Sequence, residues 1–204
     1  MNEYSVTHIL DLADEIGEHT VRSIISNFSC NINPEVENFL RNNAWDFTKK
    51  RLSSTYLVFK PNKGKALLVG YFSLTHKFFQ VDEAKLNAFS NTLKKRIDKF
   101  IIFNNELNRY MFSAPLIGQI GKNFHNNYNT MISGAELLNI ACARVDEALK
   151  IIGGKLVCIE CENKKKLTDF YKQNGFNSFS RRSLEDDEKN EMSGDYLLQM
   201  LRYL

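Results

Sequence analysis

The sequence predicts an α/β fold with a mixed central sheet and flanking helices. From residue 116 onward the pattern runs strand, helix, strand, helix, strand, strand, and such alternation favours parallel central strands joined by right-handed crossovers. Earlier, residues 55–59 and 67–75 form two β-type runs joined by a turn at residues 61–64, which predicts a hairpin. No internal repeat and no Pro/Gly/Ser-rich linker interrupts the 204 residues, so we expect a single domain.

Composition narrows the class of protein further. The 27 Lys and Arg residues nearly balance the 24 Asp and Glu residues, and 43% hydrophobic content excludes a disordered chain. The longest apolar run, residues 66–72, is far shorter than the ~18 residues of a membrane-spanning helix. The first ten residues lack a basic leader and a cleavage site, and four cysteines are too few for a disulfide scaffold. We therefore expect a cytoplasmic protein with its cysteines as thiols.

The first half of the chain is predicted to be helical on both sides of the hairpin. Apolar residues between positions 6 and 28 follow helical spacing broken at Gly17, which indicates two short helices or one kinked helix, and we assign residues 1–30 to an N-terminal helical extension. Asn33-Pro34-Glu35 reads as a cap, a first-turn proline and an acid that open a helix to about residue 52. Residues 82–100 form a basic amphipathic pattern, so we assign 82–112 to a helical insertion.

The second half contains the elements of the predicted sheet. Residues 116–122 are a strand, followed by a polar loop and a helix that runs from Ser133 to Gly153. Strand 156–162, helix 163–174 and strands 176–180 and 196–203 complete the pattern.

The junction between strand 116–122 and the helix at Ser133 carries the first chemical signal. A strand that enters a helix through a turn with Gly134 leaves unpaired backbone N–H groups at the positive end of the helix dipole. This arrangement binds anions. The alternative is that Gly134 merely allows the helix to pack closely on the strand.

Two motifs make the chain resemble the GNAT acetyltransferase superfamily. Gly134-Ala-Glu-Leu-Leu matches the end of the superfamily's pyrophosphate-binding turn, and Phe170-Tyr171-Lys-Gln-Asn-Gly-Phe matches its Tyr-x-x-x-Gly-Phe helix. The two motifs occur in the superfamily's order, over a core of residues 116–180. The resemblance implies a GNAT-like acyl-CoA N-acyltransferase fold and an acetyl-CoA-binding core in that segment.

The resemblance also implies which residues bind acetyl-CoA, a co-substrate that needs no metal. The pyrophosphate would rest on backbone N–H groups at residues 132–136, and the pantetheine arm would pair with the strand backbone at residues 120–122. Asn129 stands at the turn's amide or basic position, Asn163 stands at the start of the second helix, and Phe170 lies within that helix, next to Tyr171. The implied donor-binding residues are Ile120, Gly121, Lys122, Asn129, Ile132, Ser133, Gly134, Ala135, Glu136, Asn163 and Phe170.

Tyr171 is the implied catalytic residue, because its phenol would protonate the departing thiolate while a strand N–H stabilises the oxyanion. The alternative interpretation makes it a core aromatic residue four positions after Leu167. Glu160, Glu162, His76 and His125 are candidate general bases, each with a solvated or structural role as the simpler explanation. Cys158 and Cys161 are three apart on a strand and point to opposite faces, which argues against zinc.

We therefore expect an acetyl-CoA-dependent N-acetyltransferase acting on a primary amine that the sequence does not identify. The alternatives are a toxin-like enzyme that acetylates aminoacyl-tRNA and a non-catalytic CoA-binding or interaction module. Lys164, Lys165 and Lys166 in the first turn of a helix, with the basic residues at 94–96 and 181–182, could form a surface for an anionic partner such as tRNA. Solvated lysines are the preferred explanation, because their cost at that position is small. No membrane association is expected, and a homodimer is left open.

Overall fold

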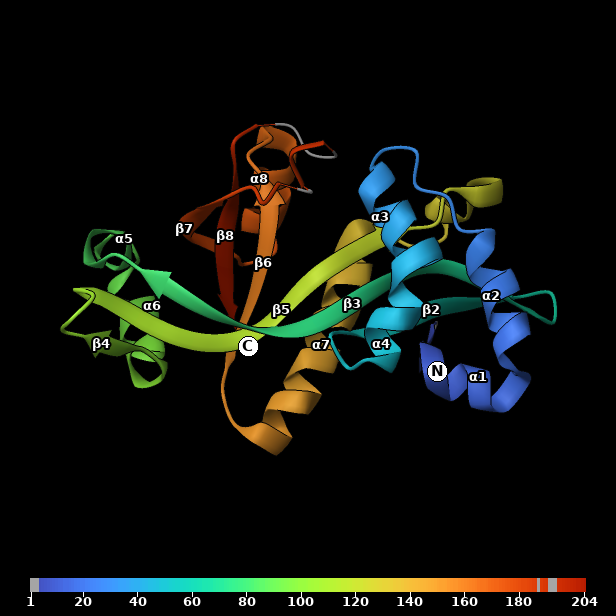
Figure 1. Ribbon diagram of the computed structural model, residues 1–204, viewed down its shortest axis with the longest axis horizontal. Coiled ribbons are helices and arrows are strands. Elements are labelled where there is room, and N and C mark those ends of the chain that lie inside the picture. The colour runs from blue at the N-terminus through green and yellow to red at the C-terminus, as the bar shows by residue number, and fades with distance from the viewer. Residues whose placement is uncertain (1–3, 187, 191–193) are drawn as a thin grey trace. The chain divides into compact units, whose positions relative to one another are not determined.

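The computed structural model describes residues 4–186, 188–190 and 194–204 (Figure 1). Contacts group these residues into two compact units. Unit 1 comprises the described residues up to Thr75 together with Gly118–Ala141, and unit 2 comprises His76–Ile117 together with Cys142–Leu204. Within the described residues the strands hydrogen-bond in the order β1-β2-β3-β5-β6-β8-β7, with β4 paired to β5. In this part of the chain no helix combines the length and apolar character needed to span a bilayer.

Unit 1 begins with a strand that the sequence analysis missed. Its regular elements before the hairpin are β1 (Ser5–His8), α1 (Ile9–Ile16), α2 (Glu18–Ser26), α3 (Pro34–Asn38), a π-helical segment (Phe39–Asn43) and α4 (Ala44–Lys49). Gly17 separates α1 from α2 with a φ of 87°, which confirms two short helices rather than one. The strand β1 pairs antiparallel with β2 from His8↔Tyr56 to Ser5↔Phe59.

The predicted hairpin is confirmed and its strands are longer than expected. Strand β2 (Ser54–Asn62) and strand β3 (Lys65–Val81) pair antiparallel from Ser54↔Leu74 to Asn62↔Lys65. Lys63 and Gly64 form the turn, both with positive φ.

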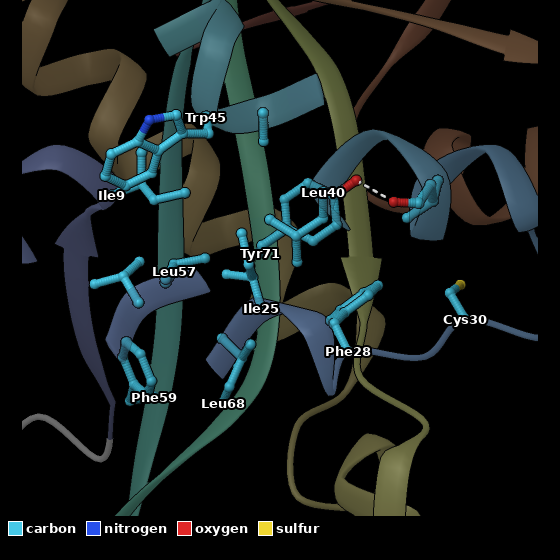
Figure 2. Packing of buried hydrophobic residues seen from close by; sticks show 13 residues of the cluster. Ile9, Ile25, Phe28, Cys30, Leu40, Trp45, Leu57, Phe59, Leu68 and Tyr71 are labelled. Carbon is cyan, nitrogen blue, oxygen red and sulfur yellow. Dashed lines mark hydrogen bonds between the residues drawn. The ribbon is translucent and has the colours of Figure 1, made fainter. Parts of the chain in front are cut away.

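The helix expected from Asn33 to about residue 52 is present from Pro34 to Lys49, and a π-helical stretch divides it into α3 and α4. Asn33 is the predicted cap, accepting a 3.4 Å bond from the Val36 N–H. Leu40 in the π-helical stretch and Ala44 and Trp45 at the start of α4 are buried. These side chains join residues of α1, α2, β2 and β3 in one core cluster, which Figure 2 shows around Tyr71.

The segment 82–112 is only partly helical. Helix α5 (Glu83–Asn87), helix α6 (Asn91–Ile97) and a 3₁₀ turn (Asp98–Phe100) replace the single expected helix. The Ser90 hydroxyl accepts a 3.2 Å bond from the Leu93 N–H and so starts a new helix. After Phe100 the apolar residues pair as strands, with β4 (Ile102–Asn104) antiparallel to the start of β5 (Arg109–Lys122).

The remaining elements match the sequence-based order. They are a 3₁₀ segment (His125–Thr130), α7 (Gly134–Ile152), β6 (Leu156–Glu162), α8 (Lys165–Gln173), β7 (Asn177–Ser183), a 3₁₀ turn (Glu188–Asn190) and β8 (Tyr196–Tyr203). Strands β5 and β6 are parallel at Leu116↔Cys158 and Ile117↔Ile159, as predicted for strands joined through a helix. Strand β8 pairs antiparallel with both β6 and β7, which makes the sheet mixed.

Candidate functional site

The junction of β5, its loop and α7 lies within unit 1 and forms the predicted helix N-terminus. The buried Asn123 fixes the start of the loop: its Oδ1 accepts bonds of 3.0 Å from the N–H groups of Ser29 and His125, and its Nδ2 donates to the Leu68 carbonyl at 2.9 Å. Gly134 and Ala135 are the first residues of α7, half-buried at the turn where N–H groups have no preceding helical carbonyl.

A hollow of about 400 Å³ opens beside this helix N-terminus. Its lining residues are Tyr4, Lys60, Lys122, Asn129, Thr130, Met131, Ile132, Ser133 and Glu136. Five of the implied donor-binding residues are thus brought together, and Gly134 and Ala135 adjoin them in sequence. Tyr4 and Lys60 were not predicted from the sequence, since both are distant in the chain from the loop and neither lies in a motif.

Two ammonium groups are fixed at the hollow by backbone carbonyls of the loop. Lys122 Nζ donates to the Asn129 carbonyl at 2.9 Å, and Lys60 Nζ donates to the Met131 carbonyl at 3.2 Å. Lys60 Nζ also lies 5.2 Å from the centre of the Tyr4 ring. Two cations beside the positive end of a 19-residue helix make this hollow favourable for a polyanion such as a pyrophosphate.

Glu136 places an anion of the chain itself at the same helix end. Its Oε2 accepts a 2.7 Å bond from the Ser133 N–H, and its own N–H donates to Ser133 Oγ at 3.1 Å, which is a capping box. The Tyr4 hydroxyl donates to Glu136 Oε1 at 3.3 Å and to the Met131 carbonyl at 3.0 Å. The hydrogen bonds with Ser133 lower the pKa of Glu136, so the carboxylate is ionised at neutral pH. An incoming phosphate has to share or displace this contact.

The strand segment 120–122 packs closely against α3 at Gly121, and Ile120 in the same segment is half-exposed. A Cβ on Gly121 would lie 2.4 Å from Val36 Cγ1, and a Cβ on Gly70 would lie 2.9 Å from the Gly121 carbonyl oxygen. Gly70 and Gly121 therefore let β3, β5 and α3 approach more closely than side chains would allow. The role of residues 120–122 in pairing with pantetheine stays a prediction.

Tyr171 lies in unit 2, on the buried side of α8. Its ring packs edge-on against Phe170 and Phe176, with centroids 5.2 and 5.7 Å away, and 6% of the residue is exposed. Burial raises the pKa of the Tyr171 phenol, and Cys161 and Cys142 raise it further, so the phenol carries its proton at neutral pH. Packing in the core and donation of a proton are both compatible with this position.

Asn163 precedes α8 and donates from Nδ2 to the Tyr196 hydroxyl at 2.8 Å. Its contact is thus within unit 2, and its role toward a donor, like that of Phe170, remains a prediction.

The four candidate general bases all make structural contacts. Glu160 accepts bonds from Lys77 at 2.9 and 3.0 Å, from Arg182 at 2.7 Å and from Gln199 at 2.8 Å. Glu162 pairs with Lys164 at 2.8 Å, and the His76 ring bonds to the Ser113 hydroxyl. His125 stacks edge-on against Tyr128 with centroids 5.9 Å apart. These contacts favour the structural interpretation for all four.

The cysteines are buried thiols, and two of the three lysines at the start of α8 pair with nearby carboxylates. All four cysteines are free and buried, and burial raises the pKa of Cys161 to about 12. Among the described residues no group of three His, Cys, Asp or Glu side chains is placed to hold a metal. Lys164 pairs with Glu162 at 2.8 Å and Lys165 with Asp169 at 2.7 Å, so the first turn of α8 has local counter-charges that the sequence analysis did not anticipate.

The fold is that of several solved toxin structures. A mutant of KacT is 16% identical to this chain and superposes with a TM-score of 0.61. The match covers 97% of this chain and 94% of the KacT chain. AtaT complexed with acetyl-methionyl-tRNAfMet is 14% identical over 96% of this chain and 93% of its own, with a TM-score of 0.59. A mutant AtaT toxin bound to the C-terminus of the antitoxin AtaR and acetyl-CoA is 16% identical over 99% and 94%, with a TM-score of 0.58. No family model and no curated sequence matches the chain.

Proposed function

We propose that this chain is an N-acetyltransferase that transfers the acetyl group of acetyl-CoA to a primary amine. The observation that carries the proposal is the hollow at the start of α7, where Lys60, Lys122 and the helix N-terminus converge. This hollow follows β5 in a fold shared with AtaT, a protein whose structure was determined with acetyl-CoA. The resemblance in the Gly134–Leu138 and Phe170–Phe176 motifs supports the same activity.

The described residues fit the donor in charge and in backbone geometry. Lys60 and Lys122 would neutralise the pyrophosphate, and the N–H groups of Gly134 and Ala135 would donate to it. Residues 120–122 would hydrogen-bond the amides of the pantetheine arm as a strand partner does. Acetyl-CoA supplies an activated thioester, and Tyr171 is the residue that we propose protonates the sulfur when the carbon–sulfur bond breaks.

The amino group of an aminoacyl-tRNA is the acceptor that we favour among primary amines. The specific support is AtaT, whose complex contains acetyl-methionyl-tRNAfMet and whose fold covers 96% of this chain. An aminoacyl ester has an amino group whose pKa lies near or below the ~7.7–8.0 of a free chain terminus, so much of it is neutral and nucleophilic at physiological pH.

Donor binding is tested by thermal unfolding with and without 1 mM acetyl-CoA. A ligand at about 100 times its Kd stabilises the native state by about 2.7 kcal/mol, which is a readily measured shift in Tm. Gly134→Glu should abolish the shift and Lys122→Gln should reduce it, whereas Lys63→Gln, in the hairpin turn, should leave it unchanged. An unmoved melting curve for the native chain would overturn the proposal.

Transfer is tested with labelled acetyl-CoA and three pools: small amines, proteins and charged tRNAs. Label that appears on charged tRNA and is lost when the aminoacyl ester is hydrolysed identifies the favoured acceptor. Label on a small amine, with charged tRNA unmodified at low salt, supports the acetyltransferase and removes the tRNA acceptor. A donor-dependent Tm shift without transfer to any pool indicates a non-catalytic CoA-binding module.

A further inference from the structure

Glu136 occupies the place at the start of α7 where a phosphate of the proposed donor would bind. Its Oε2 accepts a 2.7 Å bond from the Ser133 N–H, one of the backbone donors at this helix end. The hydrogen bonds with Ser133 hold the pKa of Glu136 below its usual value, and the charge of Lys60 lowers it further. A phosphate in the hollow would use the same backbone donor and the same cation. The carboxylate of the chain and the phosphate of the donor therefore compete for one set of partners.

Two side chains from distant parts of unit 1 hold Glu136 in this position. The Tyr4 hydroxyl lies 3.3 Å from Glu136 Oε1 and 3.0 Å from the Met131 carbonyl oxygen. Lys60 Nζ donates to the same Met131 carbonyl at 3.2 Å and lies 5.2 Å from the centre of the Tyr4 ring. Although Glu136 is exposed to solvent, its carboxylate is thus fixed by contacts from α7, from the residue before β1 and from β2.

The donor has the charge needed to displace this carboxylate. A carboxylate carries a single negative charge, whereas the pyrophosphate of CoA carries one on each phosphate. Lys122 Nζ lines the hollow and donates to the Asn129 carbonyl, not to Glu136, so a pyrophosphate gains a second cation that Glu136 does not use. The site can therefore exchange its own anion for that of the ligand.

We infer that Glu136 is an intramolecular competitor of the donor's pyrophosphate and thereby sets the affinity for acetyl-CoA. The inference rests on the donor site of the proposed function. In the free protein, Glu136 caps α7 and offsets the charge of Lys60. When acetyl-CoA binds, the carboxylate releases the Ser133 N–H and turns to solvent, and the pyrophosphate takes its place. Loss of the cap opposes binding, so the protein binds its donor more weakly than the hollow alone would allow. Occupancy of the site then follows the donor concentration.

Two variants separate the charge of Glu136 from its occupancy of the helix end. Glu136→Gln removes the negative charge but keeps a side chain that can accept from the Ser133 N–H, because Glu and Gln both form the capping box. Glu136→Ala removes the charge and the hydrogen bond together. We expect the Kd for acetyl-CoA, measured by calorimetry, to fall by about threefold in Glu136→Gln and by about tenfold in Glu136→Ala.

Glu147→Ala is the matched control for charge. Glu147 lies further along the same helix, where it pairs with Arg144 at 2.7 Å outside the hollow, so its removal should leave the Kd for acetyl-CoA unchanged. S-acetylpantetheine is the control for the ligand, since it carries the thioester and the arm but no pyrophosphate. It should bind the native chain and both Glu136 variants equally, or none of them. S-acetylpantetheine that binds Glu136→Ala more tightly than the native chain would overturn the inference.

The outcomes distinguish this inference from the proposed function. A native chain that binds acetyl-CoA at least as tightly as both Glu136 variants overturns the competition and leaves the donor site intact. Acetyl-CoA that binds none of the three chains overturns the donor site and the inference together, whereas acetyl-CoA that binds only Glu136→Ala supports both. If Glu136→Ala does not fold, Glu136→Gln decides: an unchanged Kd contradicts the inference, and a Kd lowered by about threefold supports it.

Discussion

The Tyr71 hydroxyl donates a 2.6 Å hydrogen bond to the carbonyl oxygen of Val36, drawn as the dashed line in Figure 2. Tyr71 is fully buried on β3, and Phe28 meets its ring edge-on with centroids 5.1 Å apart. The bond ties the centre of the hairpin to the first turn of α3, whose Glu35 and Val36 contact β5. The position of Glu35 on β5 thus depends on a contact deep in the core of unit 1.

Tyr71→Phe should destabilise the chain by about 1–2 kcal/mol, because the ring still packs but the buried hydrogen bond from the hydroxyl to the Val36 carbonyl is lost. Urea unfolding at pH 7 measures the difference. Tyr110→Phe, on the half-exposed start of β5, is the control and should change stability by less than about 0.5 kcal/mol. Equal stabilities of Tyr71→Phe and the native chain would mean that the bond is replaced at no cost.

Gly121→Ala should destabilise the chain by about 1–3 kcal/mol, because the new methyl would lie 2.4 Å from Val36 Cγ1. Gly118→Ala is a matched control in the same strand, since a Cβ there meets no atom within 4 Å. Combining Gly121→Ala with Val36→Ala should restore part of the loss. If Gly121→Ala and Gly118→Ala unfold at the same urea concentration, α3 does not approach β5 as closely as the structure indicates.

The order of the strands and helices could be predicted because their signals are local. Asn33-Pro34, Lys63-Gly64 and the glycines after α7 mark element ends through their own backbone preferences. Strand β1 could not be predicted, because Ser5–His8 is a strand through pairing with residues about 50 positions away. The break at Ser90 was missed because Leu86, Leu93 and Ile97 keep helical spacing across it.

The site was predicted where it follows a motif and missed where it depends on tertiary contact. The loop and first turn at residues 129–136 follow from a strand, a glycine turn and a helix. Lys60 and Tyr4 reach the hollow only through the pairing of β1, β2 and their neighbours, which no local pattern reveals. The Ser133-x-x-Glu136 capping box was a readable signal that predicts the carboxylate at the helix end.

Glu160→Gln should destabilise the chain by about 2–3 kcal/mol at pH 7, because it leaves Lys77 and Arg182 without the carboxylate that they share. Burial tends to raise the pKa of Glu160, but the hydrogen bonds from Lys77, Gln199 and Arg182 outweigh it and the pKa is lowered. A lowered folded-state pKa gives stability that is present above the unfolded value of about 4.3 and is lost as the pH falls further.

Urea unfolding of the native chain and Glu160→Gln between pH 7 and pH 3 measures this dependence. The difference in unfolding free energy should be constant near neutrality and shrink below about pH 4. Glu147→Gln, which breaks the exposed pair with Arg144, is the control and should cost less than about 1 kcal/mol at any pH. A Glu160 effect that does not diminish in acid would indicate a packing role rather than an electrostatic one.

Tyr171→Phe separates the two roles of Tyr171. The variant keeps the ring against Phe170 and Phe176 and removes only the hydroxyl, so folding and acetyl-CoA affinity should persist. The buried phenol holds its proton more tightly than usual, and a free thiol has a pKa of roughly 8.5, so the transfer has to occur as the carbon–sulfur bond breaks and negative charge accumulates on sulfur. Loss of this donor should reduce turnover by about a hundredfold or more.

Acetyl transfer, acetyl-CoA affinity and urea unfolding are measured on one preparation, with Tyr128→Phe as the control in the polar loop. Native turnover in Tyr171→Phe would make Tyr171 a core aromatic residue, whereas lost turnover with native stability and donor affinity would assign the proton to its hydroxyl.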